Sequence, residues 1–203
     1  MELPMSKSEK QDSGGRKQDR VGASARLNRE VWLVRAMDAI GREARGRMSV
    51  DELVKAVGVT KGSFYWHFKS RADFLDQLLE FWIVTFTNSI RDLASGMDSD
   101  PVERLVTVAE SVIRHQGAKY DISMHAWALR DPKVAQAVKR AEKIRFDYVG
   151  SLFRELGFQG RELDMRTRTF VVFYSFEAGL QTTQSKSARI ERIRPQVEML
   201  TRT

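Results

Sequence analysis

The sequence contains no cysteine, which excludes disulfide bonds, thiolate metal ligands and cysteine nucleophiles. Its three histidines (His67, His115 and His125) offer few ligands for a metal centre. Glycine-rich phosphate loops, nucleophile elbows and acidic or histidine clusters with metal-ligand spacing are also absent from the sequence. We therefore expect no bound metal, no cofactor and no enzymatic activity.

Long apolar runs are missing as well. The longest, residues 170–176, is interrupted by Ser175 and is far shorter than the ~18–20 apolar residues that a membrane helix needs. The first ten residues contain lysines but no apolar run behind them, so they do not resemble a secretory signal. We expect a cytoplasmic protein without a membrane partner. With 203 residues, 42% of them apolar, the chain is long enough to bury a substantial core.

The net charge of +7 is unevenly distributed along the chain. Residues 1–71 hold 15 Lys and Arg against 9 Asp and Glu, whereas residues 72–203 hold 19 against 18. This asymmetry suggests an N-terminal module that faces a polyanion and a nearly neutral C-terminal module with another role. A solvated charged surface would give the same count, so charge alone leaves both interpretations open.

Apolar residues recur with helical spacing from residue 27 onward, and strand-like alternation is absent, so the sequence predicts an all-α fold. Residues 1–25 are predicted to form a flexible basic tail, because they would bury too little apolar surface to offset the loss of chain entropy. Residues 26–72 are predicted to form a three-helix domain with a helix-turn-helix, and residues 73–203 a larger helical domain.

Residues that can cap helix N-termini mark the expected helix starts: Ser49 (in a capping box with Glu52), Thr60, Ser70, and Asp100 and Asp131, each followed by proline. The helix that starts after Ser70 is expected to reach about residue 93. Later helices are expected over about 132–156, about 162–184 and from about 188 to the end, the last one kinked or interrupted at Pro195.

The two short helices around the Val57-Gly58-Val59 turn have the layout of a helix-turn-helix. On a helical wheel Phe64 and Phe68 fall together and must face the core, which turns Trp66 outward with Tyr65 and small residues beside it. Nearby cations complete a composition typical of a DNA-binding surface. Small residues permit close approach, aromatic rings contact thymine methyls and sugars, and cations contact phosphates.

Each of these residues also has a structural interpretation. Thr60 could act only as a cap, Tyr65 or Trp66 could pack on a neighbouring helix, and His67 could be a structural histidine. All of these interpretations would have to hold together on one short helix, which favours contact with DNA.

The stretch Met48–Asp73, MSVDELVKAVGVTKGSFYWHFKSRAD, resembles the signature of tetracycline-repressor-type (TetR family) transcriptional regulators. The likeness is strongest over residues 26–75, and the later segment WALRDPKVAQAVKRAEKIRFDYVGSLFRELGF is similar, more loosely, to the ligand-domain helices of many members. Trp32, Arg35 and Met48 depart from the commonest pattern, so no contacts are carried over to the first helix. The resemblance implies DNA contacts from Ser49, Thr60, Lys61, Gly62, Ser63, Tyr65, Trp66, His67 and Lys69.

The resemblance further implies that the C-terminal helices form a ligand pocket and a dimer interface. Candidate pocket residues are large apolar or aromatic side chains with a few polar handles: Trp82, Phe86, Met124, His125, Trp127, Phe146, Tyr148, Phe173 and Glu177. Ordinary core packing is the alternative for Trp82, Phe86, Met124, Trp127, Phe146 and Phe173, and an exposed or ion-paired position is the alternative for Glu177. Candidate interface residues lie on the last two long helices: Leu163, Phe170, Tyr174, Leu180, Ile190, Ile193, Val197 and Leu200.

Together these features predict a homodimeric repressor that binds a palindromic operator in double-stranded DNA and is released by a small, largely apolar effector. Two alternatives stay open at this stage. One is a transcriptional activator of the same fold, and the other is a helical interaction protein whose helix-turn-helix does not bind DNA.

Overall fold

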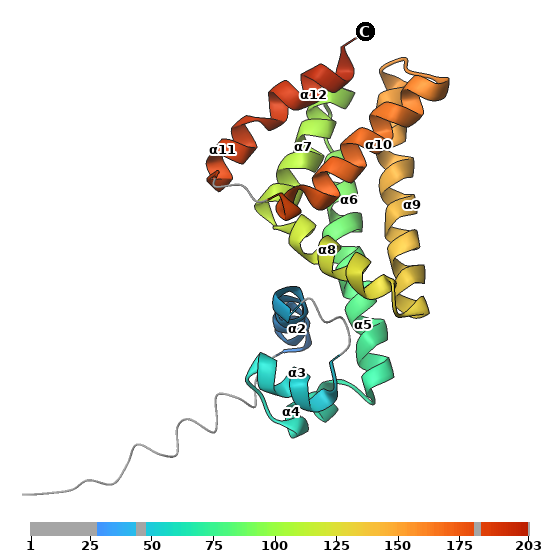
Figure 1. The fold of residues 1–203 in the computed structure, drawn as a ribbon. Helices are drawn as coiled ribbons and strands as arrows, with labels where there is room; N and C mark the ends of the chain where they lie inside the picture. The colour runs from blue at the N-terminus through green and yellow to red at the C-terminus, as the bar shows by residue number, and fades with distance from the viewer. Residues whose placement is uncertain (1–27, 44–47, 181–183, 203) are drawn as a thin grey trace, which may run out of the picture.

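The computed structural model describes residues 28–43, 48–180 and 184–202, and within these ranges every regular element is helical (Figure 1). The predicted all-α fold is confirmed. The tail predicted over residues 1–25 lies outside the described residues. None of the helices in the described ranges combines the length and the apolar character needed to cross a membrane.

Three helices, α2 (Arg29–Glu43), α3 (Val50–Val57) and α4 (Lys61–His67), form the small domain at the lower end of Figure 1. The capping box predicted at Ser49 is present: its Oγ accepts from the Glu52 N–H at 3.3 Å, and Glu52 Oε2 accepts from the Ser49 N–H at 2.7 Å. Gly58 ends α3 with φ 78°, a left-handed conformation that suits glycine. The Thr60 side chain caps α4. The predicted helix-turn-helix is thus formed by local signals.

A long helical path leads from this domain into the larger one (Figure 1). It comprises α5 (Arg71–Ile83), the π-helical turn η2 (Val84–Asn88) and α6 (Ser89–Ser95). The predicted cap is confirmed, because Ser70 Oγ accepts from the Asp73 N–H at 3.1 Å. The predicted extent is also close, but the π-helical turn was not foreseen. In it the Ser89 N–H donates to the carbonyl of Val84, five residues earlier.

The larger domain is completed by α7 (Pro101–Arg114), α8 (Gly117–Ala128), α9 (Pro132–Glu155), α10 (Gly160–Phe176), the 3-10 turn η3 (Glu177–Gly179), α11 (Lys186–Glu191) and α12 (Ile193–Thr201). Asp100 and Asp131 cap α7 and α9 through side-chain hydrogen bonds, as predicted. The helix α9 packs against both α8 and α10.

One predicted helix end differs from the structure, and the interruption predicted near Pro195 is found. The helix expected to reach residue 184 ends at Phe176, where the chain tightens into η3 and turns the Glu177 carboxylate into a buried ion pair with Arg189. The C-terminal helix is divided into α11 and α12 around Arg192, three residues before Pro195. A proline at position 195 cannot donate to the carbonyl of Glu191, so the helical hydrogen bonding breaks there.

Two clusters of buried side chains form the core. One joins α2, α3 and α4 to α5, α8 and α9, so it crosses the boundary predicted after residue 72, and the other lies among the remaining helices of the larger domain. Trp32 lies within the first cluster with none of its surface exposed. Its ring meets Phe64, Phe68 and Phe74 edge to face at centroid distances of 5.6, 5.2 and 5.5 Å. The tryptophan therefore fixes α4 against α2 and α5.

We expect Trp32→Ala to lower the free energy of unfolding by about 3–5 kcal/mol, because it leaves a cavity among three aromatic rings. Trp66 supplies a matched control, since 84% of its surface is exposed, and Trp66→Ala should change stability by no more than about 0.5 kcal/mol. Chemical denaturation followed by circular dichroism measures both. Equal losses in the two variants would contradict the assigned core.

Candidate functional site

The helix α4 carries exposed aromatic side chains on one side and buried ones on the other. Trp66 and Tyr65 are 84% and 58% exposed, whereas Phe64 and Phe68 are at most 1% exposed. The orientation predicted from the helical wheel is therefore confirmed. Phe64 and Phe68 anchor this seven-residue helix in the core. The Tyr65 ring packs edge to face on Phe64 at 5.2 Å but stays mostly in solvent, as does Trp66.

The other predicted DNA-contacting residues surround these rings. Of the nine predicted DNA-contacting residues, with Tyr65 and Trp66 included, seven are exposed, and Ser63 and His67 are half-buried. The hydroxyls of Ser49 and Thr60 both serve as helix caps, so the structural interpretation of Thr60 is realised. A Cβ on Gly62 would meet only the Thr60 side chain, at 3.6 Å, which leaves the surface beside it open.

Charge on this surface is partly compensated. Lys61 Nζ lies 2.7 Å from Asp51 Oδ1, and this hydrogen bond and charge raise the pKa of Lys61. Lys69 is exposed, and its backbone N–H donates to Asp73 Oδ2 at 2.8 Å, which ties the segment after α4 to the start of α5. Hydrogen bonds from Gln77 and from this N–H lower the pKa of Asp73. Lys61 and Lys69 therefore present cations beside Trp66, at positions where phosphates could replace or join their present partners.

A small cavity of about 50 Å³ lies in the larger domain between η2, α6, α7, α8, α9 and α10. Its walls are mostly apolar and include Ile90, Val108, Ile144, Val149, Phe170 and Val171. Of the nine predicted pocket residues, only Phe86 and Tyr148 line it.

The other seven predicted pocket residues are not brought together. Trp82, Met124 and Trp127 are buried in the first core cluster, which is where helically spaced apolar residues usually lie. Phe146 packs at the edge of the second cluster, and Phe173 is 37% exposed.

Two of the three predicted polar handles, His125 and Glu177, already have partners. The ring nitrogens of His125 lie 2.8 Å from the Asp121 carbonyl oxygen and 3.0 Å from Glu142 Oε1. Glu177 forms its ion pair with Arg189, which was the alternative stated for it. Neither residue lines the cavity.

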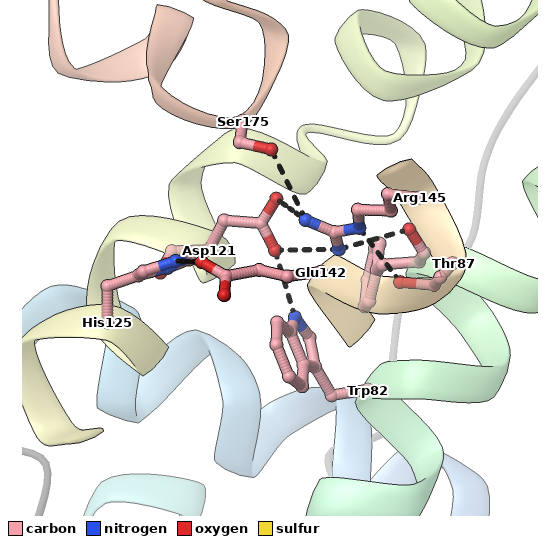
Figure 2. A network of polar contacts seen from close by, with 8 residues as sticks. Trp82, Thr87, Asp121, His125, Glu142, Arg145 and Ser175 are labelled. Atoms are coloured by element: carbon pink, nitrogen blue, oxygen red, sulfur yellow. Dashed lines mark hydrogen bonds and ion pairs between the residues drawn. The ribbon is translucent and has the colours of Figure 1, made fainter. Parts of the chain in front are cut away.

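A buried ion pair beside the cavity was missed by the sequence analysis (Figure 2). Asp121 is 2% exposed, and its Oδ2 and Oδ1 atoms lie 2.6 and 3.0 Å from Nη1 and Nη2 of Arg145. The Trp82 indole N–H also donates to Asp121, at 3.2 Å. One sequence signal was available, because Arg145 interrupts an apolar stripe of α9 that otherwise contains Val138, Ala141, Val149 and Leu152. Its partner lies 24 residues away, on α8.

The predicted dimer residues are mostly buried within their own chain, which corrects that prediction. Phe170, Tyr174, Ile193 and Val197 belong to the second core cluster, because α7 and α9 cover them. Burial and the nearby Glu177 raise the pKa of Tyr174, and its hydroxyl donates to Gln196 Oε1 at 3.0 Å.

Three further predicted interface residues, Leu163, Ile190 and Leu200, pack at the edge of the same cluster, and only Leu180 is exposed. Exposed apolar side chains lie on α10 and directly after η3 instead, and we call this set the α10 stripe: Met165, Val172, Phe173, Phe176 and Leu180.

One contact joins the small domain to the cavity wall. The Tyr120 hydroxyl on α8 donates to Asp38 Oδ1 on α2 at 2.8 Å, and Lys119 Nζ lies 3.1 Å from the same oxygen. The ring of Tyr120 packs against Phe86 of the cavity wall at a centroid distance of 4.8 Å. Burial and the bond to Asp38 raise the pKa of Tyr120 to about 12, so the hydroxyl stays protonated and donates at neutral pH.

Comparison with known proteins finds a family that matches the helix-turn-helix segment. Residues 33–78 match the family described as bacterial regulatory proteins, tetR family. The HTH-type transcriptional repressor KstR2 of Rhodococcus jostii is 32% identical over 113 residues, which cover 53% of this chain and 50% of that protein. The chain spans 45–60% of the length of the curated relatives that it matches.

Solved structures share the fold over most of the chain. A TetR-family transcriptional regulator from a Rhodococcus species superposes with a TM-score of 0.68 at 15% identity, covering 86% of this chain and 98% of that one. FadR of Bacillus subtilis, solved in complex with stearoyl-CoA, gives 0.65 at 14% identity over 86% and 98%. The helix-turn-helix segment of the chain thus matches the tetR family, and the fold of the chain resembles that of solved TetR-family regulators.

Proposed function

We propose that this protein is a homodimeric transcriptional repressor that binds a palindromic site in double-stranded DNA and is released by a small apolar ligand. The observation that carries the proposal is Trp66, which is 84% exposed on a helix whose other side is anchored by buried aromatic rings. Such a residue is costly to leave in water and is useful only when another surface covers it. The repressor KstR2, among the relatives, supports repression over activation.

Within this proposal α4 lies in the major groove. Tyr65 and Trp66 contact base edges and thymine methyls, while Lys61, His67 and Lys69 contact phosphates on either side. Ser49 approaches the backbone from the start of α3. Gly62 and Ser63 allow the helix to approach closely, since neither carries a bulky side chain. Asp51 must then give up part of its interaction with Lys61 to a phosphate. Each phosphate that a lysine neutralises releases counterions from the DNA, which makes binding sensitive to salt.

Trp66→Ala should weaken binding to a duplex selected from random sequences by about 1–3 kcal/mol and affect bulk DNA much less, because it removes a base contact. Lys69→Ala should weaken both and lower the salt slope by about one. Lys139, an exposed lysine on α9, gives the matched control, and Lys139→Ala should change neither. Titration at several salt concentrations measures all three. Equal losses on selected and bulk DNA for Trp66→Ala would mean that the ring does not read sequence, and absence of any DNA binding would favour a helical interaction protein.

A single recognition helix reads only a few base pairs, so specificity requires two copies related by a two-fold axis. The α10 stripe is the surface that we propose for this contact, in place of the buried positions expected from sequence. Its four members on α10 fall within about 100° of one another around the helix, as in a helix that packs one face against a symmetric partner, and Leu180 follows after η3.

Val172→Glu should convert the dimer to a monomer, because it places two carboxylates against each other across the two-fold axis. Leu129→Glu is the control, since Leu129 is 86% exposed at the end of α8, away from the stripe, and it should leave the dimer intact. Light scattering at micromolar concentration, with and without DNA, reports the mass. A wild-type monomer in both conditions would reject the proposed dimer.

The proposed switch uses the contacts between the two domains. The path α5–η2–α6 begins at the end of the recognition segment, and its η2 turn supplies Phe86 and Thr87 to the cavity wall. A ligand that displaces Phe86 also displaces Tyr120, which holds α2 through Asp38. Such a ligand acts by its difference in affinity between the DNA-bound and the released arrangement.

By reciprocity, binding of DNA should slow amide hydrogen exchange in α8 near Tyr120 as well as in the small domain. Tyr120→Phe should confine that protection to the small domain, because it removes the hydrogen bond to Asp38. Tyr174→Phe removes a hydrogen bond of another buried tyrosine, to Gln196, and should retain the protection in α8. Exchange measured by mass spectrometry tests the three chains. Unaltered α8 protection in Tyr120→Phe would exclude this contact as the connection.

A further inference from the structure

We infer that the cavity binds an uncharged molecule of about one small ring, held through a single hydrogen-bonding oxygen by the Tyr148 hydroxyl. The inference rests on the proposed function only in assigning the ligand a role in release from DNA. Three observations carry it: the partners of Arg145, the charge balance of the cavity wall, and the state of Tyr148.

Arg145 lines the cavity but has no donor left for a ligand. A guanidinium group carries five N–H donors. The Nε donates to Thr87 Oγ1 at 3.0 Å, Nη1 to Asp121 and to Ser175 Oγ at 2.6 and 3.4 Å, and Nη2 to Asp121 and to the Phe86 carbonyl at 3.0 and 3.4 Å (Figure 2). These five contacts account for all five donors. A ligand carboxylate would have to displace Asp121 and leave it buried without its cation.

The cavity wall also carries no uncompensated charge. Asp121 neutralises Arg145, and the other arginine of the lining, Arg91, is paired with Asp92 at 2.7 Å. The remaining lining is apolar or hydroxylic. An anion entering this space would lose its hydration without gaining a cation, which is strongly unfavourable. The wall therefore selects against charge.

Tyr148 is the lining residue whose polar group still lacks a partner. Its hydroxyl is buried and makes no hydrogen bond within the part of the chain that the structure describes. The hydroxyls of Thr87 and Ser175 are bound to Arg145, and that of Tyr174, also in the lining, donates to Gln196. A buried hydroxyl without a partner is unfavourable, so a ligand oxygen beside Tyr148 would gain a hydrogen bond at little cost.

The volume limits the size of the ligand. The cavity of about 50 Å³ is roughly one third of the ~150 Å³ apolar cavity known to take up benzene. Even a single ring must therefore displace the wall, and the wall includes Phe86 of η2. Binding and movement of the α5–η2–α6 path are linked by this lack of space.

The test uses three probes with one ring each: benzene, phenol and the charged, somewhat larger benzoate. Titration of the full chain by calorimetry should give saturable binding of benzene and a roughly three- to tenfold lower Kd for phenol, and benzoate should not bind. Tyr148→Phe should abolish the advantage of phenol and leave the Kd of benzene within about twofold. Tyr174→Phe alters the other lining tyrosine, whose hydroxyl is already satisfied, and should retain the advantage of phenol.

Binding of benzoate as tight as that of phenol, a phenol advantage that survives Tyr148→Phe, or no binding of any probe would each overturn the inference. These titrations contain no DNA, so they fail independently of the proposed function. If the chain prefers phenol through Tyr148 but binds no duplex, the inference about the cavity stands and the proposed repressor function is wrong. If the chain binds its selected duplex but none of the probes, the proposed function stands and the inference about the cavity is wrong.

Discussion

The arrangement of the larger domain depends on one buried charge pair, Asp121 with Arg145. A carboxylate that is 2% exposed is stable only while hydrogen bonds replace the water that it has lost. Asp121, on α8, accepts these bonds from Trp82 of α5 and Arg145 of α9. Arg145 donates in turn to Thr87 of η2 and Ser175 of α10, so the pair joins five elements. All five must keep their positions while the pair stays paired. The cavity lies against this ion pair. A molecule that enlarges the cavity therefore strains an ion pair whose loss would leave a buried charge without a partner.

Features encoded by neighbouring residues could be predicted from the sequence. The caps at Ser49, Thr60 and Ser70 are examples, since a hydroxyl and a backbone N–H three residues later meet whenever the helix forms. Features that require distant residues could not be predicted. The end of α10 depends on Glu177 meeting Arg189 after the chain reverses, and the ion pair of α8 and α9 joins residues 24 positions apart.

The same limit explains why the surface of α4 was anticipated and the cavity was not. A short helix with two buried phenylalanines has one possible orientation, so the exposure of Trp66 follows from spacing. Helices of the larger domain are covered on several sides, and spacing cannot show whether Trp82 or Met124 faces a void or a neighbour. Trp32, which departs from the commonest family pattern, proved to be a central part of the aromatic core.

The π-helical turn η2 is a place where the chain can lose one residue without turning the small domain. A π-helical turn holds one more residue than an α-helical turn, so either kind completes about one full turn of the helix. Deleting one residue between Val84 and Asn88 would let the helix continue in regular α geometry, with its hydrogen bonds complete and with α5 facing the same side. Deleting one residue elsewhere in α5 or α6 would instead rotate the helix before the deletion by about 100° relative to the helix after it. The extra residue of η2 therefore allows the length of this path to vary while the small domain keeps its direction relative to α9 and α10.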